Sequence, residues 1–505
     1  MISDPNTNTV HYNGQERGKD WERKKNFLVF FRIQGFLLLV EGLAMLAVLP
    51  VTWLHHGIYA YSMPFSALIT LLTSFILFVA SHKAKGVRIT SHNGVFIVSV
   101  SWLTLSLFGC LPYLIGQTLP NFTDAFFEAM SGFTTTGSTM IADVESVPKD
   151  ILLWRSLTQW MGGFGIIVFS ITILPLLSLS GMQLFVSEMN GLTYDKLHPR
   201  IMHTTRWIWS LYLFFTLLEI LLLQWGDMDL FDAVCHSMST LSSGGFSTKN
   251  DSIAGFSNYS QIVITCFMVL SGCNFSLLLL SLGRKPFAIF KNQEFRCFIT
   301  GILFFSIAIA ITLMTIQSYS VGSAVREGFF GVISIMTTTG FFVSDYLLWP
   351  QILWTILIFL MFVGACSGST SGGLKVIRVM IFVKNAFLEL KRIIHPNAII
   401  PVKVNGKALS RNVIMKNTTF VFVYFLVFLA GMLTLRSQGV DYVTALGAAV
   451  ANLSNIGTGI GHVGPNGTYA FMPQLSKWIL MLFMLLGRIE LFTLILLLSK
   501  NFWKR

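Results

Sequence analysis

The chain has 505 residues, of which 53% are hydrophobic and only 11% are charged, and its mean hydropathy is +0.67. A soluble globular protein carries about a quarter charged residues, so this composition excludes that class and predicts an all-α membrane protein that crosses the bilayer many times. The net charge of +12 does not indicate a nucleic-acid partner, because excess Lys and Arg in membrane chains lies in cytoplasmic loops.

Neither a disulfide framework nor a zinc site is expected. The six cysteines lie in or beside apolar segments without a Cys-x-x-Cys pair, which is typical of buried free thiols, and the ten histidines show no metal-ligand spacing. Residues 1–20 lack the basic start and apolar run of a cleaved signal peptide. The first membrane helix is therefore expected to serve as the insertion signal.

In chain order, residues 1–25 are predicted to be a polar cytoplasmic tail and residues 26–93 a two-helix preface, with spans at about 26–54 and 64–80. Four repeats follow, each expected to contain a helix, a half-helix with a polar loop, and a second helix. Repeats 1 to 4 cover 94–195, 196–285, 286–395 and 396–505, and their spans are 94–116 and 151–179, 204–225 and 260–282, 296–318 and 351–394, and 412–435 and 475–499. The layout gives ten full crossings and four half-helices.

A motif that occurs four times identifies the repeats. Its copies end at Gly137, Gly245, Gly340 and Gly457, which are 108, 95 and 117 residues apart. Thirteen residues before these glycines stand Asp124, Asp232, Glu327 and Thr444, which are types that cap or charge-complement a helix start. About ten mostly small or apolar residues follow, too few to span a bilayer. Each copy therefore predicts a re-entrant half-helix followed by an extended segment.

Each copy closes with a run of mostly polar residues and a glycine. Glycine permits backbone conformations in which carbonyls turn toward a central axis, and rings of carbonyls replace the hydration shell of a cation in potassium-channel filters. The four segments therefore predict one selectivity filter, with four unrelated Ser/Thr/Gly loops as the alternative. Its residues are Thr134, Thr135, Thr136, Gly137, Ser242, Ser243, Gly244, Gly245, Thr337, Thr338, Thr339, Gly340, Ser454, Asn455, Ile456 and Gly457.

Loop charges predict the orientation. Lys and Arg gather in the loops at 83–88, 196–206, 284–296 and 375–411 and in the tail from residue 500, whereas the half-helix loops hold few of them. By the positive-inside rule, both termini are cytoplasmic and the four filter loops open outward. The basic loop 375–411 is expected to face a cytosolic partner or anionic lipid headgroups.

The second helix of each repeat carries a mid-membrane glycine, and in repeat 3 this position opens a run too rich in Gly and Ser for a regular helix. Non-helical backbone at membrane depth is tolerated only when it is buried in protein or lines a wet cavity. We therefore predict an intramembrane loop that obstructs the pore below the filter and can move aside; the alternative is a small-residue packing helix. The loop comprises Gly364, Ala365, Cys366, Ser367, Gly368, Ser369, Thr370, Ser371, Gly372 and Gly373, and Lys375 follows it.

Ionisable residues inside predicted spans are functional candidates. Arg488 is expected to face the pore as an electrostatic barrier to cations. The alternative is a structural salt bridge, although Glu490 is two residues away and does not share a helix face with it. Glu41 and Glu219 are either paired structural groups or proton-coupling sites. His236 falls in a half-helix, where a packing or filter-supporting role is favoured.

These motifs resemble those of the TrkH/KtrB/HKT potassium-transport superfamily over nearly the whole chain. The most specific pieces are residues 134–138, 243–248, 336–341, 454–459, 364–375 and 487–490. The length and the two extra N-terminal helices are similar to the TrkH branch rather than the shorter KtrB branch. Ser242-Ser243 and Ser454-Asn455-Ile456 depart from the Thr-rich pattern of the other two filter segments.

The resemblance implies potassium uptake across the bacterial cytoplasmic (inner) membrane, filter roles for the four glycines, a gate role for 364–373 and a pore-arginine role for Arg488. It also implies a homodimer gated by a cytosolic nucleotide-binding ring similar to TrkA, with no organic cofactor on this chain. Some plant relatives that prefer sodium carry Ser at the first filter glycine, so four glycines favour potassium. The potassium ion is expected at Thr135, Thr136, Ser243, Gly244, Thr338, Thr339, Asn455 and Ile456.

Two other functions stay open at this point. A proton- or sodium-coupled symporter could place its ion site at the broken helix 364–373, although that design usually rests on paired repeats. An intramembrane serine hydrolase could use Ser367 or Ser369, but it needs a base within hydrogen-bond reach, and no histidine occupies a mid-span position. The chain is therefore not expected to be an enzyme.

Overall fold

The computed structural model describes the chain except for residues 1–6, 55–60, 83–90, 173–193, 284–285 and 500–505. The described residues are mostly helical, and their one sheet is the antiparallel hairpin of β1 (Lys403–Val404) and β2 (Lys407–Ala408). The predicted all-α class is confirmed. Basic residues at 83, 85, 88, 284 and 285 and in the tail from 500 lie outside the described residues.

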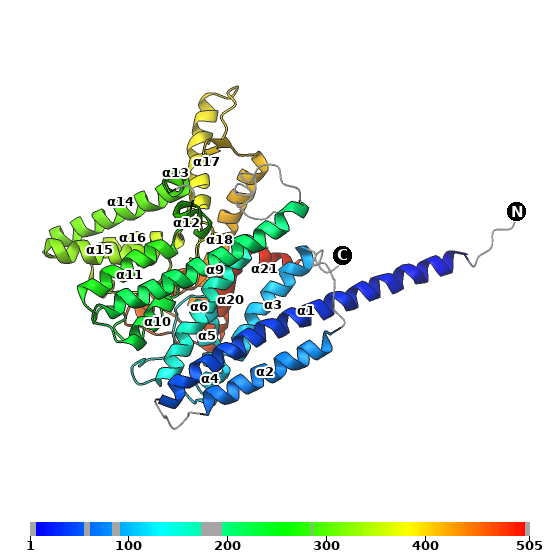
Figure 1. The fold of residues 1–505 in the computed structure, drawn as a ribbon. Coiled ribbons are helices and arrows are strands. Elements are labelled where there is room, and N and C mark those ends of the chain that lie inside the picture. The colour runs from blue at the N-terminus through cyan, green and yellow to red at the C-terminus, as the bar shows by residue number, and fades with distance from the viewer. Residues whose placement is uncertain (1–6, 55–60, 83–90, 173–193, 284–285, 500–505) are drawn as a thin grey trace.

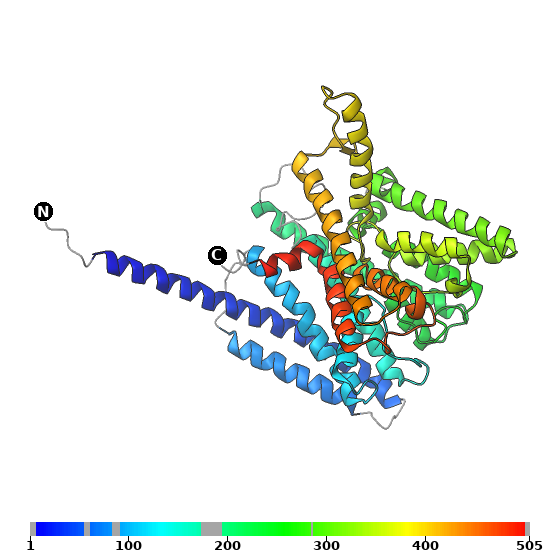
Figure 2. The same cartoon turned by 180° about the vertical axis from the view of Figure 1, so that it is seen from behind.

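Figure 1 shows the helices in chain order. They are α1 (Thr7–Leu54), α2 (Ser62–Ala80), α3 (Ser91–Gly109), α4 (Leu111–Ile115), α5 (Phe122–Phe133), α6 (Lys149–Thr172), α9 (Tyr194–Gln224), α10 (Leu230–Leu241), α11 (Asn258–Ser271), α12 (Phe275–Leu282), α13 (Ala288–Lys291), α14 (Gln293–Ile316), α15 (Val321–Met336), η1 (Tyr346–Leu348), α16 (Gln351–Phe362), α17 (Val376–Ile394), α18 (Arg411–Ser437), α19 (Tyr442–Leu453), η2 (Gly461–Val463), α20 (Gln474–Ile489) and α21 (Leu491–Leu498). Helix α1 begins inside the expected polar tail, and Figure 2 shows its N-terminal part extending beyond the other helices.

Six helices of the described chain are long and apolar enough to cross a membrane, which confirms a multi-pass membrane protein. They are α2, α14, α18 and the apolar parts of α1, α3–α4 and α9. Two further helix pairs pass the same test together but are sharply bent, α11–α12 by 101° and α20–α21 by 115°. Of the ten predicted crossings, the remaining two are α6, whose predicted end at 173–179 lies outside the described residues, and the segment 351–394, which is split into α16 and α17.

The predicted spans 260–282 and 475–499 are each broken. The first breaks at its mid-membrane glycine, where the sequence pattern predicts either a kink or close helix packing, and the second breaks three residues after its glycine. Helix α11 stops at Gly272, and Asn274 begins α12 by accepting the backbone N–H of Leu277 at 3.1 Å. Helix α20 stops where Glu490 adopts a φ of +65°. A left-handed residue cannot continue a right-handed helix, so the chain turns sharply there.

Four short, mostly buried helices are the predicted half-helices: α5, α10, α15 and α19. Each begins at a capping side chain that accepts a backbone N–H, and the caps are Asn121, Asp229, Ser320 and Asp441. The caps are therefore not the expected residues Asp124, Asp232, Glu327 and Thr444, which lie inside the helices. Asp124 and Asp232 still lie in the first turn, where a carboxylate complements the helix dipole.

The packing of these half-helices repeats four times. Each half-helix contacts a helix before and after it: α5 lies between α3 and α6, α10 between α9 and α11, α15 between α14 and α16, and α19 between α18 and α20. The helix that follows each half-helix also contacts the next half-helix, through the pairs α6–α10, α11–α15, α16–α19 and α20–α5. The last pair joins the fourth unit to the first. The four units therefore form a closed ring.

Candidate functional site

The four segments predicted as a filter share one backbone conformation. Their second residues lie in the left-handed region: Thr135 at φ +50°, Ser243 at +57°, Thr338 at +57° and Asn455 at +55°. Two positions on, Gly137, Gly245, Gly340 and Gly457 have φ between +79° and +88°. Non-glycine residues with positive φ are uncommon, and strained backbone of this kind gathers at functional sites. The same strain at four equivalent positions indicates a shared functional constraint.

The four segments also touch one another in a ring. A Cβ atom built on each filter glycine would collide with the carbonyl oxygen just before the filter glycine of the next repeat. The pairs are Gly137 with Gly244, Gly245 with Thr339, Gly340 with Ile456, and Gly457 with Thr136. The fourth pair closes the ring. Only glycine fits at these positions, so backbone rather than side chains lines the closest approach.

Repeats 2 and 4, which depart from the Thr-rich pattern, replace its hydrogen bonds with others. In repeats 1 and 3, the first and third threonine hydroxyls lie 2.8 Å apart. In repeat 2, Gln159 of α6 donates to Gly244 O at 2.7 Å and accepts from Phe246 N at 3.1 Å. In repeat 4, the hydroxyls of Tyr424 and Ser454 lie 2.8 Å apart. Gln159 and Tyr424 were missed from the sequence because nothing local links them to segments so distant along the chain.

Buried polar side chains form hydrogen bonds with the extended residues that follow the predicted filter segments. In repeat 1, Glu128 accepts from Met140 N and Arg155 Nε, both at 2.8 Å. In repeat 2, His236 Nε2 lies 2.9 Å from Ser247 Oγ, so the structure places it in the supporting position. Lys477 lies in the first turn of α20, and its Nζ is 2.6 Å from Asp124 Oδ1. Two of the few basic residues predicted on the outward side therefore serve internal ion pairs.

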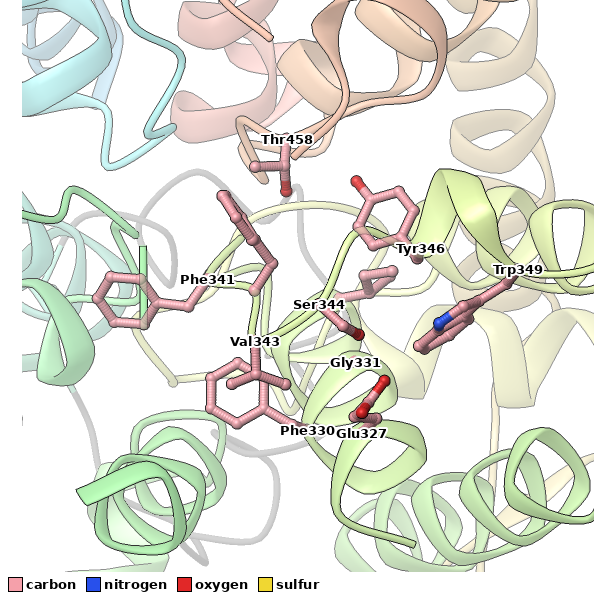
Figure 3. A pocket seen from close by; sticks show the side chains of 11 residues that line it. Glu327, Phe330, Gly331, Phe341, Val343, Ser344, Tyr346, Trp349 and Thr458 are labelled. Atoms are coloured by element: carbon pink, nitrogen blue, oxygen red, sulfur yellow. The ribbon is translucent and has the colours of Figure 1, made fainter. Parts of the chain in front are cut away.

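Repeat 3 has a small pocket at the corresponding place (Figure 3). Glu327, Gly331, Ser344, Tyr346, Trp349 and Thr458 are among its lining residues. Glu327 Oε2 and Trp349 Nε1 are buried and have no hydrogen-bond partner in the described chain. Thr458 Oγ1 donates to the filter carbonyl of Gly340 at 3.0 Å.

The predicted gate segment is a buried, non-helical loop between α16 and α17, so the alternative of a continuous packing helix is wrong. Its ends are joined by Gly364 N donating to Leu374 O at 2.8 Å. At its tip, Ser367 donates through its backbone N and its hydroxyl to the Glu294 carboxylate, at 2.6 and 2.8 Å. Asn274 donates to Ser367 O at 2.5 Å. Glu294 was not singled out from the sequence, because the predicted span began at residue 296. An acidic residue in the first turn of a membrane helix could have identified it.

Arg488 lies in the last turn of α20 and is buried. It donates to Thr370 O of the gate loop at 2.7 Å and to Gly162 O of α6 at 2.9 Å. The alternative of a salt bridge with Glu490 is wrong, because Glu490 Oε2 lies 2.6 Å from Arg378. Arg488 thus bridges the loop and repeat 1.

The remaining ionisable candidates divide into residues that contact the loop and two isolated carboxylates. Lys375 is half-buried and donates to Ser371 O of the loop. Arg378 and Arg488 line a small cavity there with Glu490. The carboxylate oxygens of Glu41 and Glu219 have no hydrogen-bond partner in the described chain, which does not support a role as paired structural groups.

Comparison with known proteins identifies the family. Residues 65–505 match the TrkH family, described as cation transport protein. The chain belongs to the TrkH family. TrkH of Escherichia coli K12 is 39% identical over 444 residues, which cover 86% of this chain and 91% of the relative. TrkH of Vibrio parahaemolyticus is 37% identical over 486 residues, which cover 95% of this chain and 99% of the relative.

Escherichia coli TrkG is more distant, at 32% identity over 93% of this chain and 97% of its own length. All three relatives are named Trk system potassium uptake proteins, not enzymes. The crystal structure of the potassium transporter TrkH from Vibrio parahaemolyticus matches with a TM-score of 0.87 and 36% identity, covering 95% of this chain and 100% of that one. The predicted resemblance to the TrkH branch is confirmed.

Proposed function

We propose that this chain takes up potassium across the cytoplasmic membrane through a pore whose filter is the ring of segments 134–137, 242–245, 337–340 and 454–457. The single observation that carries the proposal is the closed ring in which each filter glycine abuts a carbonyl of the next repeat. Rings of carbonyl oxygens substitute for the hydration shell of a potassium ion. The names of the relatives supply the ion.

The gate in this proposal is the loop 364–373. It lies against the filter, its residues are mostly buried, and Arg488 adds a positive charge beside it. A cation leaving the filter inward meets both the loop backbone and this charge. Conduction then requires the loop to move away from the filter.

The proposed setting is a bacterial inner membrane with both termini in the cytoplasm. The basic helix α17 and the hairpin that follows it then face the cytosol, where a nucleotide-binding regulatory ring would dock on a homodimer of this chain. The words "Trk system" in the names of the relatives support a multi-component assembly. No organic cofactor is proposed for this chain.

A symporter with its ion site in the broken helix is less well supported. The loop carbonyls of Ser367, Gly368 and Thr370 accept hydrogen bonds from Asn274 Nδ2, Phe275 N and Arg488. Carbonyls engaged in this way are poor cation ligands, because a bound ion would have to displace those donors. The hydrolase is less well supported as well. The Ser369 hydroxyl donates to Cys366 O at 2.6 Å rather than to a base. The Ser367 hydroxyl does donate to the Glu294 carboxylate at 2.8 Å, but the relatives are named potassium uptake proteins.

Rubidium uptake into proteoliposomes of the purified chain, competed separately by potassium and sodium, tests the proposal. We expect competition by potassium and not by sodium. Because a closed gate also abolishes uptake, the assay is repeated with residues 367–371 deleted. Equal competition by the two ions in an active sample would contradict potassium selectivity.

Gly340→Ser tests the ring itself. The new side chain meets Ile456 O at a backbone with φ +82°, so repeat 3 must move relative to repeat 4. We expect potassium-over-sodium discrimination to fall at least about tenfold, which corresponds to about 1.4 kcal/mol, with expression unchanged. Gly322→Ser is the matched control, because nothing lies within 4 Å of a Cβ there. Unchanged selectivity in Gly340→Ser would remove Gly340 from the filter.

A further inference from the structure

The gate loop and the filter share hydrogen bonds that go beyond simple obstruction. The residues involved are the second residues of the filter segments, which all lie in the left-handed region. In repeat 3, Thr338 Oγ1 accepts from Gly372 N of the loop at 2.7 Å. In repeat 2, Ser243 Oγ lies 2.8 Å from Thr370 Oγ1. Two different points of the loop thus bind two neighbouring filter segments.

The direction of the repeat 2 contact follows from the surrounding bonds. Thr370 Oγ1 donates to Ser271 O at 3.2 Å, so its proton is already in use. Ser271 Oγ likewise donates to Met268 O at 2.8 Å. The Ser243 hydroxyl is therefore the donor toward Thr370 Oγ1. Without that contact, the buried Ser243 hydroxyl would have to turn to Ser271 Oγ, 3.1 Å away.

Repeat 4 is in contact with the same part of the loop. A Cβ on Gly372 would collide with Ser454 O and would lie 2.7 Å from Asn455 Cβ, so the loop backbone packs directly beneath that segment. In repeat 1 the equivalent residue is Thr135, which is buried and whose Oγ1 has no hydrogen-bond partner among the described residues. The loop therefore contacts the segments of repeats 2, 3 and 4, and it does not bind the Thr135 hydroxyl of repeat 1.

These contacts bear on the most strained part of the filter. A β-branched residue with positive φ is held there only by its surroundings, and at Thr338 those surroundings include the loop. Displacing the loop removes a hydrogen bond from Thr338 and another from Ser243, so both segments are freer to relax. Conversely, an ion that stabilises the strained filter also favours the docked loop. Linkage between two binding equilibria is reciprocal by thermodynamic necessity.

We propose that Ser243 and Thr338 are positioning residues that couple the gate loop to the filter, so that potassium in the filter stabilises the docked loop and loop displacement loosens the filter. This inference rests on the proposed function and deepens it: the same loop that blocks the pore also senses filter occupancy. Thr135 is outside the coupling.

Cys366 provides a reporter of loop position, because it lies in the loop and is only 2% exposed. The other five cysteines are replaced by alanine, and the rate of Cys366 modification by a small methanethiosulfonate is measured in liposomes containing the full chain. Potassium is compared with N-methyl-D-glucamine, which is too large for a carbonyl ring. We expect potassium to slow modification about two- to tenfold, the range that follows from one net hydrogen bond.

Ser243→Ala and Thr338→Val are expected to abolish this potassium dependence and to raise basal rubidium uptake. Thr135→Val is the matched comparison, because it removes an equivalent filter hydroxyl that the loop does not bind. It measures the effect of altering a filter residue as such, and Ser243→Ala and Thr338→Val should lose more of the dependence. Ser243→Thr keeps the hydroxyl and should restore it. If Thr338→Val does not give a monodisperse protein, Ser243→Ala decides alone, since its partner lies elsewhere in the loop.

Two results would overturn the coupling. One is a parent protein with potassium-selective uptake whose Cys366 reacts equally fast with and without potassium; the proposed function would then survive. The other is loss of the potassium dependence in Thr135→Val to the same degree as in Thr338→Val, which would assign the effect to pore hydroxyls in general. Failure of the proposed function is distinct, because uptake in the parent would then show no preference for potassium.

Discussion

The predicted filter segments of repeats 1 and 3 have the same conformation, but different side chains pack behind them. Both carry a Thr-Thr-Thr-Gly segment with matching backbone and a 2.8 Å hydroxyl pair. Nine residues before the filter glycine, repeat 1 has Glu128, which forms a buried ion pair with Arg155, whereas repeat 3 has Gly331. In repeat 1 the charged side chains of Glu128 and Arg155 fill this space, whereas in repeat 3 the equivalent space is a small pocket.

The comparison separates two kinds of position. The close approach of neighbouring backbones requires the four glycines, whereas the side chains packed behind them can differ between repeats. A substitution at one of the four glycines must displace the neighbouring repeat, because any Cβ meets one of its carbonyls. The support behind them can be ionic or aromatic. In repeat 1, Arg155 also stacks 4.1 Å from the ring centre of Phe246, which ties repeat 1 to the strand of repeat 2. Repeat 3 instead packs the Trp349 ring over Gly331, with a built Cβ 3.3 Å from Cη2.

The largest expected effect comes from removing the cation of repeat 1. Arg155→Leu leaves the buried Glu128 carboxylate without its cation, so that only the neutral donors Thr139 Oγ1 and Met140 N remain. Breaking a buried ion pair in this way costs about 3–5 kcal/mol. We expect a large drop in the thermal unfolding temperature of the purified protein in detergent. The double variant Glu128→Gln/Arg155→Met is the control and should recover much of the loss. A single variant as stable as the parent would show that the ion pair does not brace this filter.

A smaller effect is expected from Phe246→Leu, which keeps an apolar core residue but removes the ring under the Arg155 guanidinium. A desolvated cation–π contact is worth up to about 2 kcal/mol, so the loss of stability should stay below that of Arg155→Leu. Thermal unfolding of both variants and of their combination measures this. Additive losses would argue against a shared network.

The smallest effect is expected in repeat 3. Glu327→Gln changes a carboxylate whose Oε2 has no hydrogen-bond partner in the described chain, so stability should change by less than about 1 kcal/mol. Glu128→Gln is the matched substitution in repeat 1 and should cost more, because Glu128 accepts bonds from Met140 and Arg155. Equal losses in the two variants would mean that the pocket of repeat 3 hides a partner of comparable strength.

The repeats, the half-helices and the non-helical loop at 364–373 could be predicted from the sequence because each has a local signature. Hydrophobic length limits a half-helix, and a Gly- and Ser-rich run cannot remain helical at membrane depth. The break at Glu490 could not be predicted, since nothing local signals that a glutamate will adopt φ +65°. That conformation accompanies a contact with Arg378, which is far away in the chain.

The site residues that sequence analysis missed were missed for the same reason, namely contacts with residues far away in the chain. Gln159, Asn274 and Glu294 are single polar residues in or beside apolar segments, and their partners in the filter and gate loop are distant along the chain. The helix starts were displaced for a simpler reason. Several capping types stand close together, as in Asn121 and Asp124, and spacing alone did not show which one accepts the first free N–H.

The closed ring has a consequence for how this protein can vary. In a pore assembled from four identical subunits, every substitution appears four times. Here the four segments are encoded separately, and each of the four glycines lies against a carbonyl oxygen of one neighbouring repeat. A mutation therefore alters a quarter of the ring, and its effect passes first to a single adjacent strand. Under the proposed function, ion preference can therefore be adjusted in fractional steps that a fourfold identical pore does not have.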